Sequence, residues 1–288
     1  ELVRALIMKT GKRKVCLTGG VALNCNANAK LLIDKIVDDL FILPASSDKG
    51  QAIGNALYGF HLLEGYCPRN RLRNDYFGRT YSETEILSTL NRKGGILEKY
   101  VPTHDFKFDK QNDIAKTVAN LLAQEKIVGW FQKGSELGPR ALGHRSILCD
   151  PRKIGMRHIL NSRVKHREEF RPFAPSCIQK RASEYFELDH PSPYMLLSMP
   201  VKESVKNLIP AVVHVDGTSR IQTVTHKNND KFYALLEEFD RITGMPMVLN
   251  TSFNDRGPIV ETPMDALSVF LGTDMDYLAI GDFLIHKT

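Results

Sequence analysis

Short apolar runs alternate along this chain with longer segments in which apolar residues recur at helical spacing. Residues 127–131 (IVGWF) carry no charge or polar side chain, which is typical of a strand buried on both faces. The segment before them, 112–124, repeats its apolar residues with the period of a helix. Strands and helices that alternate in this way predict the α/β class of fold.

The other elements are predicted from the same patterns. Strands are expected at 14–17, 40–43, 174–178, 195–201, 211–215, 221–224, 247–250 and 277–285, and helices at 28–36, 51–63, 153–162, 230–243 and 263–271. Gly244 and Gly272 follow the last two helices, where glycine commonly ends a helix. Ser82 stands three residues before Glu85, a capping-box arrangement that predicts one further short helix.

Two domains are expected from the length and from the order of these elements. The 288 residues, 42% of them hydrophobic, are enough for about two domains. Residues 1–65 hold only two predicted strands with their helices, so we expect half a domain whose N-terminal portion is absent. Polar, irregular residues predict a linker region over 66–107, and a second α/β domain fills 108–288. No apolar run approaches the roughly 20 residues that cross a bilayer, so we expect a cytoplasmic protein without membrane contact.

The positive charge of the chain is concentrated in one stretch. The net charge is +6, and ten Lys or Arg against four acidic residues between Lys133 and Arg171 account for all of it. A confined patch on a neutral body favours a small anionic ligand, with a solvated basic face as the alternative. Phe170 is the one aromatic residue of this stretch, which disfavours base stacking and hence nucleic-acid binding.

Two polar loops follow the first two predicted strands. Residues 18–24 (TGGVALN) contain Gly19 and Gly20, whose backbone can approach a ligand, and 44–50 (PASSDKG) is the second loop. Successive strand ends of an open sheet share one crevice in which ligands bind. A structural glycine turn and an ordinary N-cap role for Asp48 are the alternatives.

Residues 134–146 (GSELGPRALGHRS) are the densest motif of the chain. Three glycines and a proline predict an irregular loop, on which Arg140, His144 and Arg145 can converge on phosphate oxygens. Arginine suits this task because its planar guanidinium donates two parallel hydrogen bonds. Several such pairs would hold a polyphosphate.

Two further segments carry polar side chains for the same ligand. Lys165, Arg167 and Arg171 lie on a segment that ends in two prolines, and a surface network with the neighbouring acids is the alternative. Residues 250–254 (NTSFN) follow a predicted strand. Their hydroxyls and amides, at Thr251, Ser252 and Asn254 among others, are suited to phosphate or ribose, with a cap or turn as the alternative.

The chain resembles the O-carbamoyltransferases of antibiotic biosynthesis and nodulation over essentially its whole length. The matching motifs, in the order of that family, are 19–28 (GGVALNCNAN), 47–57 (SDKGQAIGNAL), 138–152 (GPRALGHRSILCDPR), 161–176 (NSRVKHREEFRPFAPS), 211–224 (AVVHVDGTSRIQTV) and 249–254 (LNTSFN). The resemblance implies the C-terminal end of an actin-like ATPase-fold transfer domain followed by a YrdC-like domain. It also implies the chemistry: carbamoyl phosphate and ATP, with Mg²⁺, form carbamoyl adenylate, and the carbamoyl group passes to the hydroxyl of a small-molecule acceptor.

The resemblance also implies roles for particular residues. Gly19, Gly20 and Asn24 would line an adenylate pocket of the transfer domain, and Asp48 would ligate a ferrous-type metal whose other ligands belong to the absent portion. In the YrdC-like domain the residues implied in phosphate and nucleotide binding are Lys165, Arg167, Arg171, Ser252 and Asn254. The further candidates for an electrostatic clamp on the phosphates are Arg140, His144, Arg145 and Arg220. Two alternatives stay open, a YrdC-like enzyme of transfer-RNA threonylcarbamoylation and a non-catalytic nucleic-acid-binding module.

Overall fold

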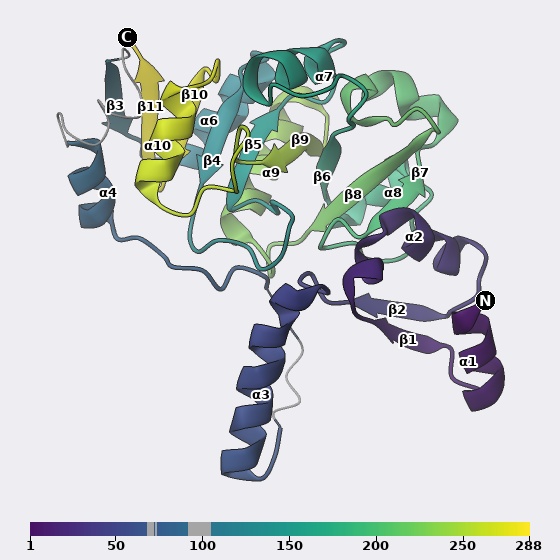
Figure 1. Cartoon of the computed structure of the whole chain (residues 1–288). Coiled ribbons are helices and arrows are strands. Elements are labelled where there is room, and N and C mark those ends of the chain that lie inside the picture. The colour runs from purple at the N-terminus through teal and green to yellow at the C-terminus, as the bar shows by residue number, and fades with distance from the viewer. Residues whose placement is uncertain (68–71, 73, 92–104) are drawn as a thin grey trace.

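The computed structural model describes residues 1–67, 72, 74–91 and 105–288, which contain two separate sheets. The smaller sheet is a parallel pair, β1 (Lys14–Leu17) and β2 (Asp39–Ile42). The larger sheet has nine strands in the order β3-β11-β10-β4-β5-β9-β6-β8-β7, with parallel and antiparallel pairs (Figure 1). The expected α/β class is confirmed, in the form of a mixed α/β fold with one large mixed sheet.

The middle of the larger sheet is buried on both faces. Its strands are β3 (Phe106–Lys110), β4 (Val128–Phe131), β5 (Arg145–Cys149), β6 (Ala174–Ile178), β7 (Leu197–Pro200), β8 (Thr218–Val224), β9 (Met247–Ser252), β10 (Tyr277–Ile280) and β11 (Phe283–Lys287). Every residue of β4, β5 and β6 is buried. Burial on both faces explains why the run at 127–131 lacks the alternation of a surface strand.

Helices cover both faces of this sheet (Figure 1). Helices α6 (Ile114–Ala123) and α9 (Asp230–Thr243) pack against each other on one face, and α10 (Pro263–Leu271) lies on the other. The buried residues of α9 recur every three or four positions, as Phe232, Leu235, Leu236 and Phe239. The short helix α4 (Glu83–Leu90) begins with the predicted capping box, in which Ser82 and Glu85 bond each other's backbone. Within the described residues, no helix is long and apolar enough to cross a bilayer.

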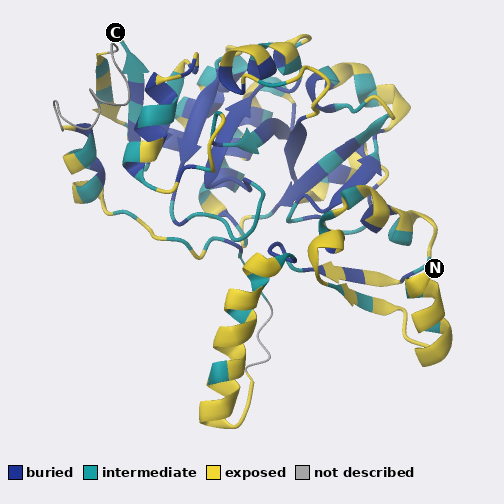
Figure 2. Cartoon of the chain, in the orientation of Figure 1, coloured by how far each residue is buried: buried dark blue, intermediate teal, exposed yellow. Residues whose placement is uncertain are grey.

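The first 65 residues are much less buried than the rest (Figure 2). They contain α1 (Leu2–Thr10), α2 (Cys25–Ile33) and α3 (Gln51–Glu64) around the two-stranded sheet. Helix α3 extends away from the body and has no buried residue (Figures 1 and 2). Helix α2 instead packs against β7, where Asn28 Nδ2 donates a hydrogen bond to Leu196 O at 3.0 Å.

Three predicted elements differ from the structure in type or continuity, and each difference has a local cause. Helix α2 also begins and ends three residues before its predicted range of 28–36. The strand predicted at 211–215 is wrong, because Pro210 has no N–H for a ladder and instead starts a 3₁₀ turn (Pro210–Val212). The strand predicted at 277–285 is two antiparallel strands, β10 and β11, separated by a turn at Gly281 with φ 57°. The helix predicted at 153–162 begins only after Gly155, at α7 (Met156–Ile159), and continues as a π-helix (Leu160–Val164).

Candidate functional site

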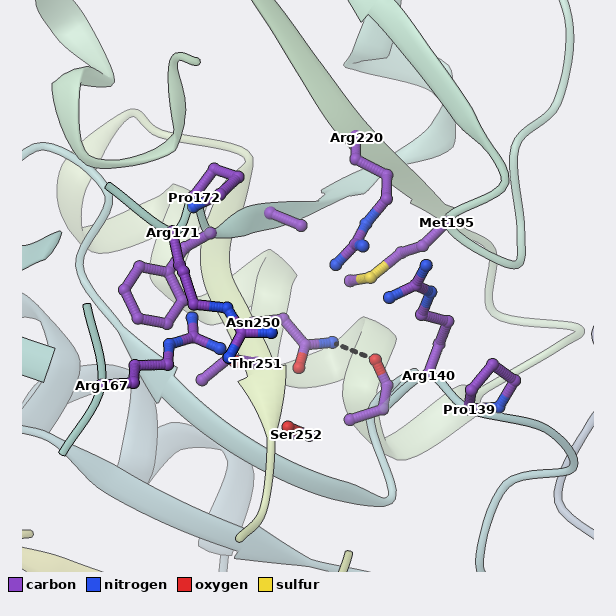
Figure 3. A pocket seen from close by; sticks show the side chains of 13 residues that line it. Pro139, Arg140, Arg167, Arg171, Pro172, Met195, Arg220, Asn250, Thr251 and Ser252 are labelled. Atoms are coloured by element: carbon purple, nitrogen blue, oxygen red, sulfur yellow. Dashed lines mark hydrogen bonds between the residues drawn. The ribbon is translucent and has the colours of Figure 1, made fainter. Parts of the chain in front are cut away.

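Four arginines converge on one cavity of about 200 Å³ (Figure 3). We call it the arginine cavity, and its wall consists of Pro139, Arg140, Ala141, Arg167, Arg171, Pro172, Phe173, Ala174, Met195, Arg220, Asn250, Thr251 and Ser252. Arg140 and Arg220 enter from one side with Met195 between them, and Arg167 and Arg171 enter from the opposite side. Among these lining residues there is no carboxylate to offset the four positive charges.

The large sheet places these side chains through three of its strands and two loops. Arg220 lies on β8, and β9 ends in Thr251 and Ser252. Arg140 belongs to the loop between β4 and β5, which is the glycine-rich motif of the sequence. Arg167 and Arg171 belong to the loop between the π-helix and β6. The cavity therefore unites three of the predicted motifs.

Burial lowers the pKa of three of these guanidiniums. Desolvation lowers the pKa of Arg140, Arg167 and Arg220, the last to about 10 with the charge of Arg140 as a further cause. The Nε atoms of Arg140 and Arg220 are buried and have no hydrogen-bond partner among the described residues. Buried donors usually have partners, so an anion in this cavity would supply both the missing acceptor and the countercharge.

Lys165 lies behind the wall of the cavity and does not line it. Its Nζ donates to the backbone and side-chain oxygens of Ser252, at 2.5 and 3.2 Å, and of Asn254, at 2.8 and 2.7 Å. Ser252 Oγ in turn donates to Asn254 Oδ1 at 2.7 Å. Burial, with Arg167 as the next cause, lowers the pKa of Lys165 to about 7. The structure thus brings together three of the five residues implied in phosphate and nucleotide binding, and Lys165 fixes the loop that carries Ser252 and Asn254.

His144 and Arg145 point into the scaffold and not into the arginine cavity. Arg145 is fully buried, donates to Gln132 O at 2.8 Å and Lys133 O at 3.1 Å, and stacks on Phe131 with 3.6 Å from the guanidinium carbon to the ring centroid. His144 Nε2 accepts a hydrogen bond of 3.0 Å from Asn229 Nδ2. Burial lowers the pKa of His144 to about 3. Both residues shape the loop that carries Arg140.

The four candidates of the first 65 residues are exposed and lie outside the arginine cavity. Gly19 adopts φ 87° at the turn into α2, which Gly20 continues. Asn24 caps α2, because its side chain accepts a hydrogen bond from Ala27 N at 3.1 Å. Asp48 lies in a short 3₁₀ helix. Among the described residues, no group of three or more His, Cys, Asp or Glu is close enough to hold a metal ion.

A second hollow of about 410 Å³ adjoins the arginine cavity and shares Pro139, Arg140 and Ser252 with it. Asn254 and Lys49 belong to its wall, so the first 65 residues contribute one cation. The two parts of the chain also meet at Gly138, where φ is 102° and a Cβ atom would lie 2.4 Å from Pro44 O. Only glycine fits this contact.

Two polar or unusual lining residues of the arginine cavity have no individual role in the sequence prediction, although Asn250 belongs to the predicted 250–254 motif. Asn250 Nδ2 donates to Ser176 Oγ at 2.9 Å and to Ala141 O at 3.3 Å, and thus joins three segments at the cavity floor. Met195 adopts φ 54°, which is unusual for a bulky residue. Asn250 could be found from the sequence as a polar residue at the end of a buried strand. Nothing in the sequence around Met195 indicates that it lines the cavity.

The mixed sheet and the arginine cavity together define an α/β protein with a small cavity lined by four arginines. The family model described as carbamoyltransferase C-terminus matches residues 119–287, and the one described as carbamoyltransferase N-terminus matches residues 1–57. The chain belongs to the carbamoyltransferase family, a family of transferase enzymes.

Several relatives are similar over almost the whole chain. The nodulation protein NolO of Bradyrhizobium diazoefficiens is 41% identical over 96% of this chain and 50% of its own length. The nodulation protein NolNO of Sinorhizobium fredii is 42% identical over 96% of this chain and 40% of its own length. The chain therefore spans about half the length of the curated relatives it matches.

One solved structure is similar in part. Full-length HypF in its phosphate- and nucleotide-bound form has a TM-score of 0.43 and 18% identity, over 65% of this chain and 23% of that one. A likeness of this size carries no argument about the site.

Proposed function

We propose that the arginine cavity activates carbamoyl phosphate with ATP, as one part of an ATP-dependent O-carbamoyltransferase. One observation carries the proposal: four guanidiniums face one small cavity, and two of them have buried Nε donors without described partners. Guanidinium groups bind phosphate oxygens through charge-assisted bonds, and a cavity of about 200 Å³ suits a phosphate-sized group.

The proposed reaction has three steps. Water cleaves carbamoyl phosphate to carbamate and phosphate. An oxygen of the carbamate then attacks the α-phosphorus of ATP, and pyrophosphate leaves with the electrons of the broken P–O bond. An acceptor hydroxyl finally attacks the carbamoyl carbon, so that AMP and a proton are released and the carbamate ester remains.

The residues of the cavity act on the phosphates in the first two steps. Arg140 and Arg220 are positioned before the ligand arrives, so they stabilise negative charge as it develops without reorganising. Arg167 and Arg171 hold the same ligand from the opposite wall. The adjoining hollow of about 410 Å³ takes the rest of the nucleotide, because it continues from Arg140 and Ser252 toward Lys49.

Metal ions enter this proposal only through the substrate. The lining is cationic, so Mg²⁺ would be held by the phosphate oxygens of ATP and would neutralise part of their charge. Asp48 stays a proposed ligand of a ferrous-type metal in the transfer reaction, and the described residues near it form no metal-binding group. No step is therefore assigned to that metal.

The domain organisation is proposed in the same terms. Residues 108–288 form a YrdC-like activation domain, residues 66–107 a linker region, and residues 1–65 the end of an actin-like transfer domain. The two sheets and the two matching family models support a division of this kind.

Replacing Arg220 tests the proposal. Because Arg220 is a charged donor whose Nε is buried, Arg220→Ala is expected to weaken binding of carbamoyl phosphate by about a hundredfold. Calorimetric titration measures the affinity, and pyrophosphate release from ATP and Mg²⁺, with and without carbamoyl phosphate, measures turnover. Arg163→Ala, a change at an exposed arginine outside the cavity, is the control. Equal binding by Arg220→Ala and the control would contradict the proposal.

A further inference from the structure

The loop that carries Arg140 is closed by a single carboxylate oxygen. Glu136 Oε1 accepts hydrogen bonds from three backbone N–H groups, those of Leu142 at 2.7 Å, His144 at 2.8 Å and Arg145 at 3.1 Å. Arg140 lies in the sequence between Glu136 and Leu142, the first of these anchor points. Each N–H donor bonded to a carboxylate is held more firmly than one bonded to a neutral oxygen.

The same loop is fastened on its other side to the floor of the arginine cavity. Gln222 Nε2 donates to Leu142 O at 2.9 Å, and Asn250 Nδ2 donates to Ala141 O at 3.3 Å. The carbonyl groups of the loop thus bind the sheet while its N–H groups bind Glu136. A shift of the Glu136 oxygen would therefore move the backbone that follows Arg140 relative to Arg220.

A second buried carboxyl group lies beside Glu136. Asp75 contacts the loop through its backbone, where Asp75 O accepts from Leu137 N at 2.5 Å, but its Oδ2 has no described partner. Burial raises the pKa of both carboxyls, and the charge of Glu136 raises that of Asp75 further. The three N–H donors favour the ionised form of Glu136, and its charge favours the protonated form of Asp75.

We infer that Glu136 is a positioning residue of the anion site, which acts on a bound phosphate through Arg140 without touching it. The inference rests on the proposed function only in requiring that the arginine cavity binds a phosphate. Glu136 lines the adjoining hollow and not the arginine cavity, so it does not hold a phosphate there directly. Its three N–H contacts give it a geometric role instead.

Two substitutions separate geometry from charge. Glu136→Asp keeps the charge but withdraws the oxygen by one methylene, and we expect it to weaken binding of inorganic phosphate at least tenfold. Glu136→Gln keeps an oxygen at the same reach, and we expect its affinity to stay within threefold of wild type. Glu187→Asp, at an exposed glutamate, is the control. Titration calorimetry with inorganic phosphate gives the affinities, and circular dichroism confirms that each variant is folded.

A double-mutant cycle with Arg140→Ala tests the route of the effect. If Glu136 acts through Arg140, adding Glu136→Asp to Arg140→Ala causes no further loss of phosphate affinity, whereas a general loosening of the fold would add its own loss. Wild-type affinity in Glu136→Asp, or additive losses in the double variant, would overturn the inference. If Glu136→Asp does not fold, Glu136→Gln decides, since a tenfold loss there contradicts a geometric role.

The same cycle distinguishes the inference from the proposed function. Wild-type phosphate affinity in both Arg140→Ala and Arg220→Ala would show that the arginine cavity is not the anion site, and the proposed function would fail. Weak binding by these two variants together with normal binding by Glu136→Asp would reject the role of Glu136 alone.

Discussion

Arg171 differs from the other arginines of the cavity in its exposure. Its side chain is 54% exposed and 3.9 Å from Glu168, so solvent screens its charge more than that of the buried Arg220. We expect Arg171→Ala to lower the use of carbamoyl phosphate or ATP by about tenfold, roughly 1.4 kcal/mol. Initial rates of pyrophosphate release measure this, with Arg163→Ala as control. Unchanged kinetics would remove Arg171 from the site.

His144 is expected to make the fold sensitive to acid. Its pKa is lowered to about 3 in the folded chain, below the usual value near 6.5, so the unfolded chain binds the extra proton first. The stabilising contribution of neutral His144 is therefore complete above pH 6.5 and is lost as the pH falls toward 3, by about 1.4 kcal/mol per unit. Urea unfolding from pH 7 to 4 should show a shallower acid decline in His144→Gln than in wild type. Parallel curves for the two proteins would contradict this.

One side-chain amide of helix α2 forms a hydrogen bond to the larger part of the chain. Asn28 Nδ2 donates to Ala22 O at 2.8 Å and to Leu196 O at 3.0 Å, and the side chain is buried. Asn28→Ala leaves both carbonyls without this donor, so we expect a loss of about 1–3 kcal/mol in the free energy of unfolding. Urea unfolding measures it, and the exposed Asn26→Ala should change the value by less than about 0.5 kcal/mol. Equal stability of the two variants would show that the Asn28 contacts contribute nothing.

Elements with both a periodic pattern and a local stop signal are predictable from this sequence. The helix at 230–243 and the strand at 174–178 are confirmed at the predicted bounds, the former because Gly244 ends it in the αL conformation. The strands β3 and β5 are not predicted. β5 begins at Arg145, a residue whose charge suggests a ligand-binding loop, although its two terminal guanidinium nitrogens donate to backbone carbonyls.

The candidate site is predictable in its chemistry but not in its geometry. Charge and motif density indicate an anion site, and Arg140, Arg167, Arg171 and Arg220 do share a cavity. The sequence cannot tell that Lys165 lies one layer behind them, because a lysine that binds a phosphate and a lysine that binds four protein oxygens occur in the same kind of motif. Only the tertiary contacts with Ser252 and Asn254 distinguish the two.

The stability of the whole molecule is expected to be uneven, and two helices of equal length test this. Helices α3 and α9 both have 14 residues and both end at a glycine in the αL conformation, but α3 has no buried residue whereas α9 buries four. Because protection against hydrogen exchange follows tertiary packing, the amides of α3 should exchange much faster than those of α9. Exchange measured by mass spectrometry gives both rates in one sample. Comparable protection would mean that α3 is covered in solution.

The tight fit of Gly138 against Pro44 has a consequence for the evolution of the chain. The two loops that meet there belong to the stretches matched by different family models, and a side chain at position 138 would meet the backbone oxygen of Pro44 unless one loop withdraws. A substitution in one of these loops would thus be tolerated only if the other loop accommodates it. Recombination between distant lineages would succeed only where both loops are exchanged together. We therefore expect the two stretches to be inherited together, although each has its own sheet.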